Sequence, residues 1–108
     1  MILYISDILN YISQQNIDCH YYVDKNLSIN NFCSLNNLKA NSITWIKNIE
    51  KYDLTNIDKT LKLLIVTNNK SIDEIKIKGY NVITCSNPKE IFFSILTEFF
   101  KNNTPSKI

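Results

Sequence analysis

The stretches LKLLIVT (residues 61–67) and NVITC (residues 81–85) decide the fold of this chain. Both are rich in aliphatic and β-branched residues, and the first shows almost no alternation of polar and apolar positions. This pattern is typical of a strand that is buried on both faces of a parallel sheet. The residues between Thr67 and Asn81 are numerous enough for the crossover that joins two parallel strands. We therefore expect the two stretches to be adjacent parallel strands of one sheet.

The residues beside these strands predict two helices. Two isoleucines at helical spacing within residues 71–78 favour a short helix, and Gly79, the only glycine of the chain, suits the left-handed end of such a helix. Asn87 as N-cap and Pro88 as the first helical residue predict the start of a C-terminal helix. The apolar face of this last helix is formed by Ile91, Phe92, Ile95, Leu96, Phe99 and Phe100.

The first half of the chain carries weaker signals. Ser6 is a plausible N-cap, and the residues after it predict a helix that ends near residue 16. Residues 19–23 and 27–31 are short strand candidates that flank a turn-prone Asp-Lys-Asn triplet, so they predict a β-hairpin. Residues 43–46 predict another strand, and residues 48–58 predict a helix.

The order of these elements predicts a single small α/β domain with a mixed sheet, a βαβ unit in its second half and a C-terminal helix. We expect this domain to span residues 1–101. Residues 102–108 are polar and contain a proline, which is typical of a linker.

Composition and charge argue against several classes of protein. The chain has 108 residues, of which 44% are hydrophobic and 20% are charged, as in an ordinary globular domain. The net charge is only +2 and all 12 basic side chains are lysines, so the arginine forks that commonly read nucleic acids are missing. We expect no nucleic-acid partner.

The N-terminal sequence and the cysteines predict a cytoplasmic protein. The apolar start of the chain lacks a basic region and is interrupted by Asp7 and Asn10, unlike a signal peptide. No stretch is long enough to predict a membrane span. The three cysteines are widely spaced and odd in number, so we expect reduced thiols, with Cys33 and Cys85 in the core.

The sequence predicts no catalytic residue, metal site or cofactor. His20 follows Cys19, but neighbouring residues of a strand point to opposite faces, so we expect a half-buried histidine rather than a metal ligand or a base. A single glycine cannot form a phosphate-binding glycine loop.

Two segments, SLNNLKANSITWIKNIEKY (residues 34–52) and VITCSNPKEIFFSILTEFF (residues 82–100), resemble a known family. They are similar to the N-terminal domain of the lipid A-pathway N-acyltransferases, which transfer a 3-hydroxyacyl chain to a UDP-linked 3-O-acylglucosamine. Several positions carry the resemblance: Leu35 and Ala40 before the strand, residues 42–46 in it, Asn48 after it, the corner of residues 87–89, and the phenylalanines 99 and 100 that end the last helix.

The resemblance implies a uridine-binding site. Trp45 stands where the family has a phenylalanine that stacks on uracil, and Asn48 stands where an asparagine reads the edge of the base. Lys51 occupies the position of a tyrosine that covers the other side of the base, with Tyr52 one residue beyond it. Asn41 replaces a glycine, which is a mild change because asparagine tolerates a positive φ.

The physical chemistry of these side chains allows two interpretations of Trp45. An indole ring stacks on a base for about 1–3 kcal/mol, and an amide matches the donor and acceptor groups of uracil or thymine. Alternatively, Trp45 is a core residue of a buried strand.

The resemblance predicts a nucleotide-sugar (uridine) recognition domain, not catalytic in itself, of a bacterial sugar N-acyltransferase in lipid A or lipopolysaccharide biosynthesis. It implies a UDP- or dTDP-linked amino sugar as ligand. Acyl-carrier protein or acyl-coenzyme A would donate the acyl group to the amine of this sugar, in a left-handed β-helix domain that lies outside this sequence and belongs to a homotrimeric parent protein. The alternative is a structural or interaction module with a degenerate nucleotide site that packs beside such a β-helix. A third possibility, the small domain of a UDP-linked peptide ligase, lacks the nucleotide-triphosphate loop of those enzymes.

Overall fold

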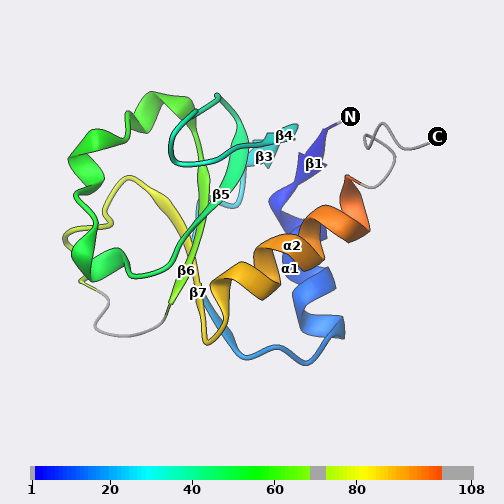
Figure 1. Cartoon of the computed structure of the whole chain (residues 1–108). Helices are drawn as coiled ribbons and strands as arrows, with labels where there is room; N and C mark the ends of the chain where they lie inside the picture. The colour runs from blue at the N-terminus through cyan, green and yellow to red at the C-terminus, as the bar shows by residue number, and fades with distance from the viewer. Residues whose placement is uncertain (1, 69–72, 101–108) are drawn as a thin grey trace.

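The computed structural model describes residues 2–68 and 73–100 of the chain (Figure 1). Its central element is a sheet of five strands in the order β2-β7-β6-β5-β4. The strands are β2 (Cys19–Tyr22), β4 (Asn31–Phe32), β5 (Ser42–Ile46), β6 (Leu64–Asn68) and β7 (Asn81–Cys85). Strands β4 to β7 are parallel, and β2 runs antiparallel to β7 at one edge.

Residues 64–67 of the first deciding stretch and the whole second stretch are adjacent parallel strands, as predicted. The first strand starts at Leu64 rather than at residue 61, because Lys62 adopts a left-handed conformation with φ of +57°. Strand β6 pairs with β7 from Leu64 opposite Asn81 to Asn68 opposite Cys85. All five residues of β6 are buried. The predicted fold class, a mixed α/β domain with a C-terminal helix, is confirmed.

Two α-helices cover one face of the sheet (Figure 1). They are α1 (Ile5–Gln14) and α2 (Pro88–Phe99). Their buried side chains form one apolar cluster with Leu64 and Val66 of β6. The hydroxyls of Tyr11 and Ser94 form a hydrogen bond that joins the two helices.

A second apolar cluster lies on the opposite face of the sheet. It contains Ile65 of β6 and the buried Ile49, Leu54 and Ile57 of a segment with three short 3₁₀ turns. These turns are η1 (Ile49–Lys51), η2 (Leu54–Asn56) and η3 (Lys59–Leu61). The sheet therefore has α-helices on one face and an irregular segment on the other.

The prediction of a helix over residues 48–58 is wrong, because these residues form separate 3₁₀ turns. Asp53 and Asp58 each accept hydrogen bonds from the backbone N–H and the hydroxyl of the threonine two residues later, Thr55 and Thr60. Each Asp-x-Thr unit therefore starts a new 3₁₀ turn, because the side chain competes with continued helical hydrogen bonding.

The short helix expected within residues 71–78 is also wrong for its described part. Residues 71 and 72 lie outside the described residues, and residues 74–79 form turns. Asp73 Oδ1 accepts from the backbone N–H of Ile75 and Lys76, and Ile75 is 86% exposed, so it contributes no packed helical face. Gly79 does adopt the expected left-handed conformation, with φ of +88°.

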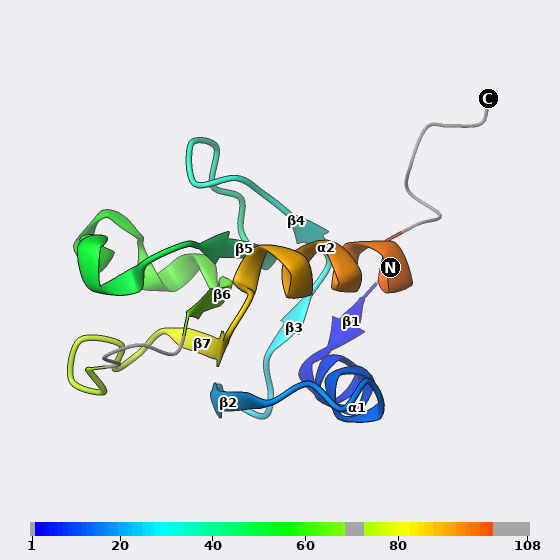
Figure 2. The same ribbon diagram turned by 60° about the horizontal axis from the view of Figure 1, so that its bottom comes forward.

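The β-hairpin of residues 19–31 does not form. Strand β2 pairs with β7 instead, and residues 27–31 divide into β3 (Ser28–Ile29) and the start of β4. Strand β3 pairs with β1 (Leu3–Tyr4) in a separate two-stranded sheet beside α1 (Figure 2). The partners of these strands are distant in the sequence, so the local pattern could not select them.

Smaller differences concern single residues. Helix α1 begins at Ile5, because the N-cap is Tyr4, whose backbone N–H donates to Asp7 Oδ2 at 3.2 Å. Ser6 is therefore inside the helix. His20 is exposed rather than half-buried, whereas Cys33 and Cys85 are buried as expected.

Within residues 2–68 and 73–100, no helix combines the length and the apolar character needed to cross a bilayer.

Candidate functional site

A cleft of about 730 Å³ opens at the carboxyl ends of β5, β6 and β7. Ligands of open parallel sheets commonly bind at this edge, because the loops that follow the strands converge there. The cleft is lined by Trp45, Lys47, Asn48, Asn68, Ser86, Asn87, Pro88, Lys89, Glu90 and Phe93.

Two aromatic side chains line this cleft. Trp45 projects from β5 toward the helical face, where it is half-buried against the apolar cluster that contains α1 and α2. Phe93 projects from α2 and is 50% exposed. The ring of Trp45 therefore packs on the core and also borders the open cleft. The cleft offers two aromatic surfaces to a planar ligand.

Two amides form a polar pair in the same cleft. Asn68, the last residue of β6, is only 8% exposed, and its Nδ2 donates to Asn48 Oδ1 at 2.8 Å. Among the residues that the structure describes, Asn68 Oδ1 has no hydrogen-bond partner. The hydrogen bond fixes the Asn48 side chain, and its Nδ2, which has no recorded partner among residues 2–68 and 73–100, can donate to a ligand.

The N-terminus of α2 forms the positive side of the cleft. Pro88 is its first residue and has no N–H, and the next N–H groups, of Lys89 and Glu90, precede the first intrahelical donor, Ile91, which bonds to Asn87 O. The ammonium groups of Lys47 and Lys89 add charge, against the single carboxylate of Glu90. Helix N-termini with nearby cations bind phosphate groups.

The structure brings together two of the four residues predicted for the site. Trp45 and Asn48 both line the cleft. Lys51 is exposed at the end of η1 and does not line it, and Tyr52 packs half-buried against the cluster on the opposite face of the sheet. The burial of Ile49 directs the chain to that opposite face directly after Asn48.

Three further residues of the cleft, Phe93, Lys89 and Asn68, were not predicted from the sequence. Phe93 and Lys89 are four residues apart and so share one face of α2. The sequence contained a signal for Phe93, because it is the one phenylalanine of this helix that falls outside the predicted apolar face. Asn68 had no such signal, since the predicted strand ended one residue before it.

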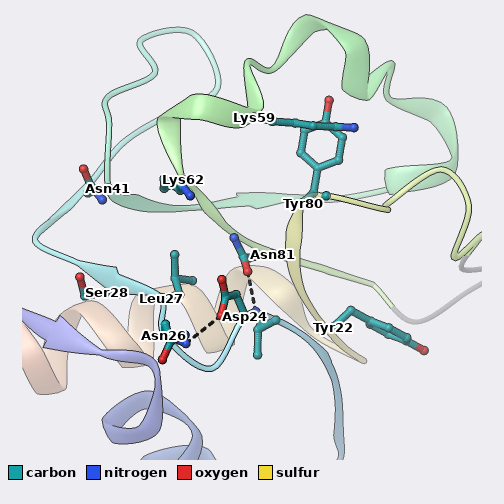
Figure 3. Close-up of a pocket in the computed structure, with 12 residues that line it drawn as sticks. Tyr22, Asp24, Asn26, Leu27, Ser28, Asn41, Lys59, Lys62, Tyr80 and Asn81 are labelled. Carbon is teal, nitrogen blue, oxygen red and sulfur yellow. Dashed lines mark hydrogen bonds between the residues drawn. The ribbon is translucent and has the colours of Figure 1, made fainter.

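A second cavity, of about 540 Å³, lies toward the amino ends of β6 and β7 (Figure 3). Its prominent groups already have partners within the fold. Lys59 Nζ lies over the ring of Tyr80, 5.1 Å from its centroid, and the Tyr80 hydroxyl donates to the carbonyls of Leu54 and Ile57. Asn81 Oδ1 accepts from the backbone N–H of Asp24 at 2.7 Å. These contacts support the fold, so we assign the candidate site to the cleft that contains Trp45.

Comparison with known proteins adds no assignment: no family model matches this sequence, and no curated protein is significantly similar to it. The described part of the chain also contains no group of three or more His, Cys, Asp or Glu side chains placed to hold a metal ion. The assignment of the candidate site therefore rests on the geometry of the cleft.

Proposed function

We propose that this domain recognises the nucleotide of a UDP- or dTDP-linked amino sugar and that it serves a sugar N-acyltransferase without being catalytic itself. One observation carries the proposal. Trp45 and Asn48, the two residues that the resemblance assigns to the base, lie in one cleft beside the N-terminus of α2. The left-handed φ of Asn41, 53°, at a position where the resembled family has glycine, adds support.

In the proposed complex the pyrimidine stacks on the indole of Trp45. Phe93 provides the second aromatic surface, in place of the ring that the family supplies from the segment after the strand. The free Nδ2 of Asn48 donates to a carbonyl oxygen of the base, and Asn68 holds this amide in position.

The diphosphate fits the positive side of the cleft. The free N–H groups at the start of α2 and the ammonium of Lys89 would neutralise its charge. The sugar would then extend out of the cleft, toward the acyl-transfer centre. In the family that this chain resembles, a trimeric left-handed β-helix transfers the acyl group from acyl-carrier protein or acyl-coenzyme A to the amine of the sugar, in the cytoplasm.

A structural or interaction module is the second candidate. The position of Lys51 and Tyr52 favours it, because neither residue faces the cleft and the second ring of the family's base sandwich is therefore missing. In that case the cleft binds no nucleotide, and the domain only packs beside the acyltransferase.

Titration with UMP distinguishes the two functions. Trp45 is the only tryptophan, so its fluorescence reports directly on the cleft. We expect saturable quenching by UMP and by a UDP-sugar, with a dissociation constant no lower than the high micromolar range, because few contacts offset the entropy lost on association. AMP and ribose 5-phosphate should bind more weakly.

Two variants test the assignment of residues by calorimetry. Trp45→Ala should abolish UMP binding while circular dichroism shows a folded domain. Lys51→Ala is the matched control and should bind UMP as the wild type does, because Lys51 lies outside the cleft. A folded Trp45→Ala protein with unchanged affinity for UMP would refute the nucleotide site and favour the structural module.

A further inference from the structure

Two of the three cysteines face each other across the edge of the sheet. Cys19 begins β2 and Cys85 ends β7, and the two are direct partners in the antiparallel register. Directly opposite residues of such a pair share one face, with Cα atoms about 4.5 or 5.5 Å apart according to their place in the ladder. A disulfide needs a Cα separation of about 4.4–6.8 Å. The backbone therefore satisfies this requirement in either case.

The two cysteines also change each other's pKa. The Cys85 thiol donates to the carbonyl of Thr67 at 3.7 Å. The neighbouring Cys19 thiol lowers the pKa of Cys85 against the opposing effect of burial, and the backbone N–H of Asn87 lowers it further. The proximity of Cys85, together with burial, raises the pKa of the Cys19 thiol. Cys19 is half-buried, so a small oxidant can reach it, whereas Cys85 is buried. The pair thus joins an accessible sulfur to a buried one with more thiolate character.

The third cysteine provides an internal comparison. Cys33 is buried in the cluster on the opposite face of the sheet, whereas Cys19 and Cys85 belong to the cluster that contains α1 and α2. The sheet separates Cys33 from the pair.

We propose that Cys19 and Cys85 form a redox modification site that hydrogen peroxide converts into an intramolecular disulfide. The peroxide oxidises one sulfur of the pair to a sulfenic acid and releases one water. The other sulfur then attacks the sulfenic sulfur, the S–S bond forms, and a second water leaves with the proton of the attacking thiol. In total, the dithiol loses two electrons and two protons to one peroxide. A dithiol reductant reverses the step by thiol–disulfide exchange.

The position of the bond gives it a structural effect. Strand β2 is an edge strand, and β7 is its neighbour in the sheet. A disulfide would attach this edge covalently, directly before Ser86 and Asn87, which line the cleft at the start of α2. Oxidation would therefore restrain the backbone that leads into the candidate site.

The test uses the full chain and hydrogen peroxide. Reduced protein is treated with peroxide, its remaining thiols are alkylated under denaturing conditions, and tryptic peptides are identified by mass spectrometry. Cleavage after lysine places the three cysteines in separate peptides, residues 1–25, 26–39 and 79–89. We expect peptide 1–25 linked to peptide 79–89, alkylated Cys33, a monomer on a non-reducing gel, and loss of the link after dithiothreitol.

Matched variants complete the test. Cys33→Ser should form the same link, and Cys19→Ser should form none. The wild-type peptide map decides the proposal even if a variant folds poorly. Disulfide-linked dimers, a link that includes Cys33, or a sulfinic acid at Cys19 without the cross-link would overturn it.

Discussion

Two neighbouring phenylalanines of α2 allow ligand binding to be separated from stability. Phe92 is only 5% exposed and belongs to the helical cluster, whereas Phe93 is 50% exposed and lines the cleft. Their rings are in edge-to-face contact with centroids 5.2 Å apart, so either change to alanine removes the same aromatic pair. The two variants differ only in which environment loses its ring.

The expected magnitudes follow from these positions. Phe93→Ala loses about half the burial energy of a phenylalanine and the aromatic pair, which lowers the free energy of unfolding by about 1–2 kcal/mol. It also loses one stacking surface, worth about 1–3 kcal/mol, so the dissociation constant for UMP should rise about 5- to 150-fold. Phe92→Ala should lower the free energy of unfolding by about 3–5 kcal/mol.

Urea unfolding followed by circular dichroism measures the stability of both variants, and calorimetry with UMP measures their affinity under native conditions. The folded fraction of Phe92→Ala should bind UMP almost as the wild type does, because the ring of Phe92 does not line the cleft. Wild-type affinity in Phe93→Ala, or equal destabilisation by the two changes, would refute the assignment of Phe93 to the ligand.

Three further predictions concern the fold. Gly79→Ala should lower the free energy of unfolding by about 1–2 kcal/mol, because φ is +88° and the new Cβ would lie 3.1 Å from Lys59 Cδ; Gly79→Asn should cost less, and equal urea midpoints for all three proteins would contradict this. Tyr80→Phe removes a hydroxyl that donates to two carbonyls at 2.7 and 3.0 Å, and thermal and urea unfolding should show a loss of about 1–3 kcal/mol. The backbone N–H of Thr60, and then its hydroxyl, lower the pKa of Asp58. The stability that Asp58 contributes is therefore complete above its unfolded pKa of about 3.9 and is lost as the pH falls through the lower folded pKa. Asp58→Asn should weaken this acid dependence in urea titrations at several pH values, and an unchanged dependence would show that the carboxylate is not involved.

The parts of the fold with strong local patterns were predictable from the sequence. The largely apolar run of residues 61–67 predicted the buried strand β6, which starts at Leu64, and Pro88 marked the first residue of α2. The parallel orientation of β6 and β7 was predicted from the length of the connection between them.

Elements that depend on distant partners were not predictable in the same way. Strand β2 has the local sequence of a hairpin strand, yet its partner β7 lies more than sixty residues later, and only the completed sheet selects it. The prediction of a helix in the segment of 3₁₀ turns was wrong for a different reason. Its isoleucines and leucine have helical composition, but the side chains of Asp53 and Asp58 cap the start of a new 3₁₀ turn and so prevent one continuous helix.

The candidate site was predictable only where it follows a strand directly. The resemblance named Trp45, in β5, and Asn48, two residues after this strand, and both line one cleft. Lys51 and Tyr52 follow a change of direction at the buried Ile49, which spacing alone does not reveal. Phe93 comes from another element, and its position depends on how α2 packs across the sheet.

Strand β6 has a consequence for how the domain unfolds. Its side chains alternate between the two apolar clusters, with Leu64 and Val66 in one and Ile65 in the other, and it has a hydrogen-bonded neighbour on each side. Neither cluster can open fully without disturbing this strand, so the two halves of the core form one cooperative unit. The slowest amide hydrogen exchange in the domain should therefore occur along Leu64–Asn68, at the rate set by global unfolding.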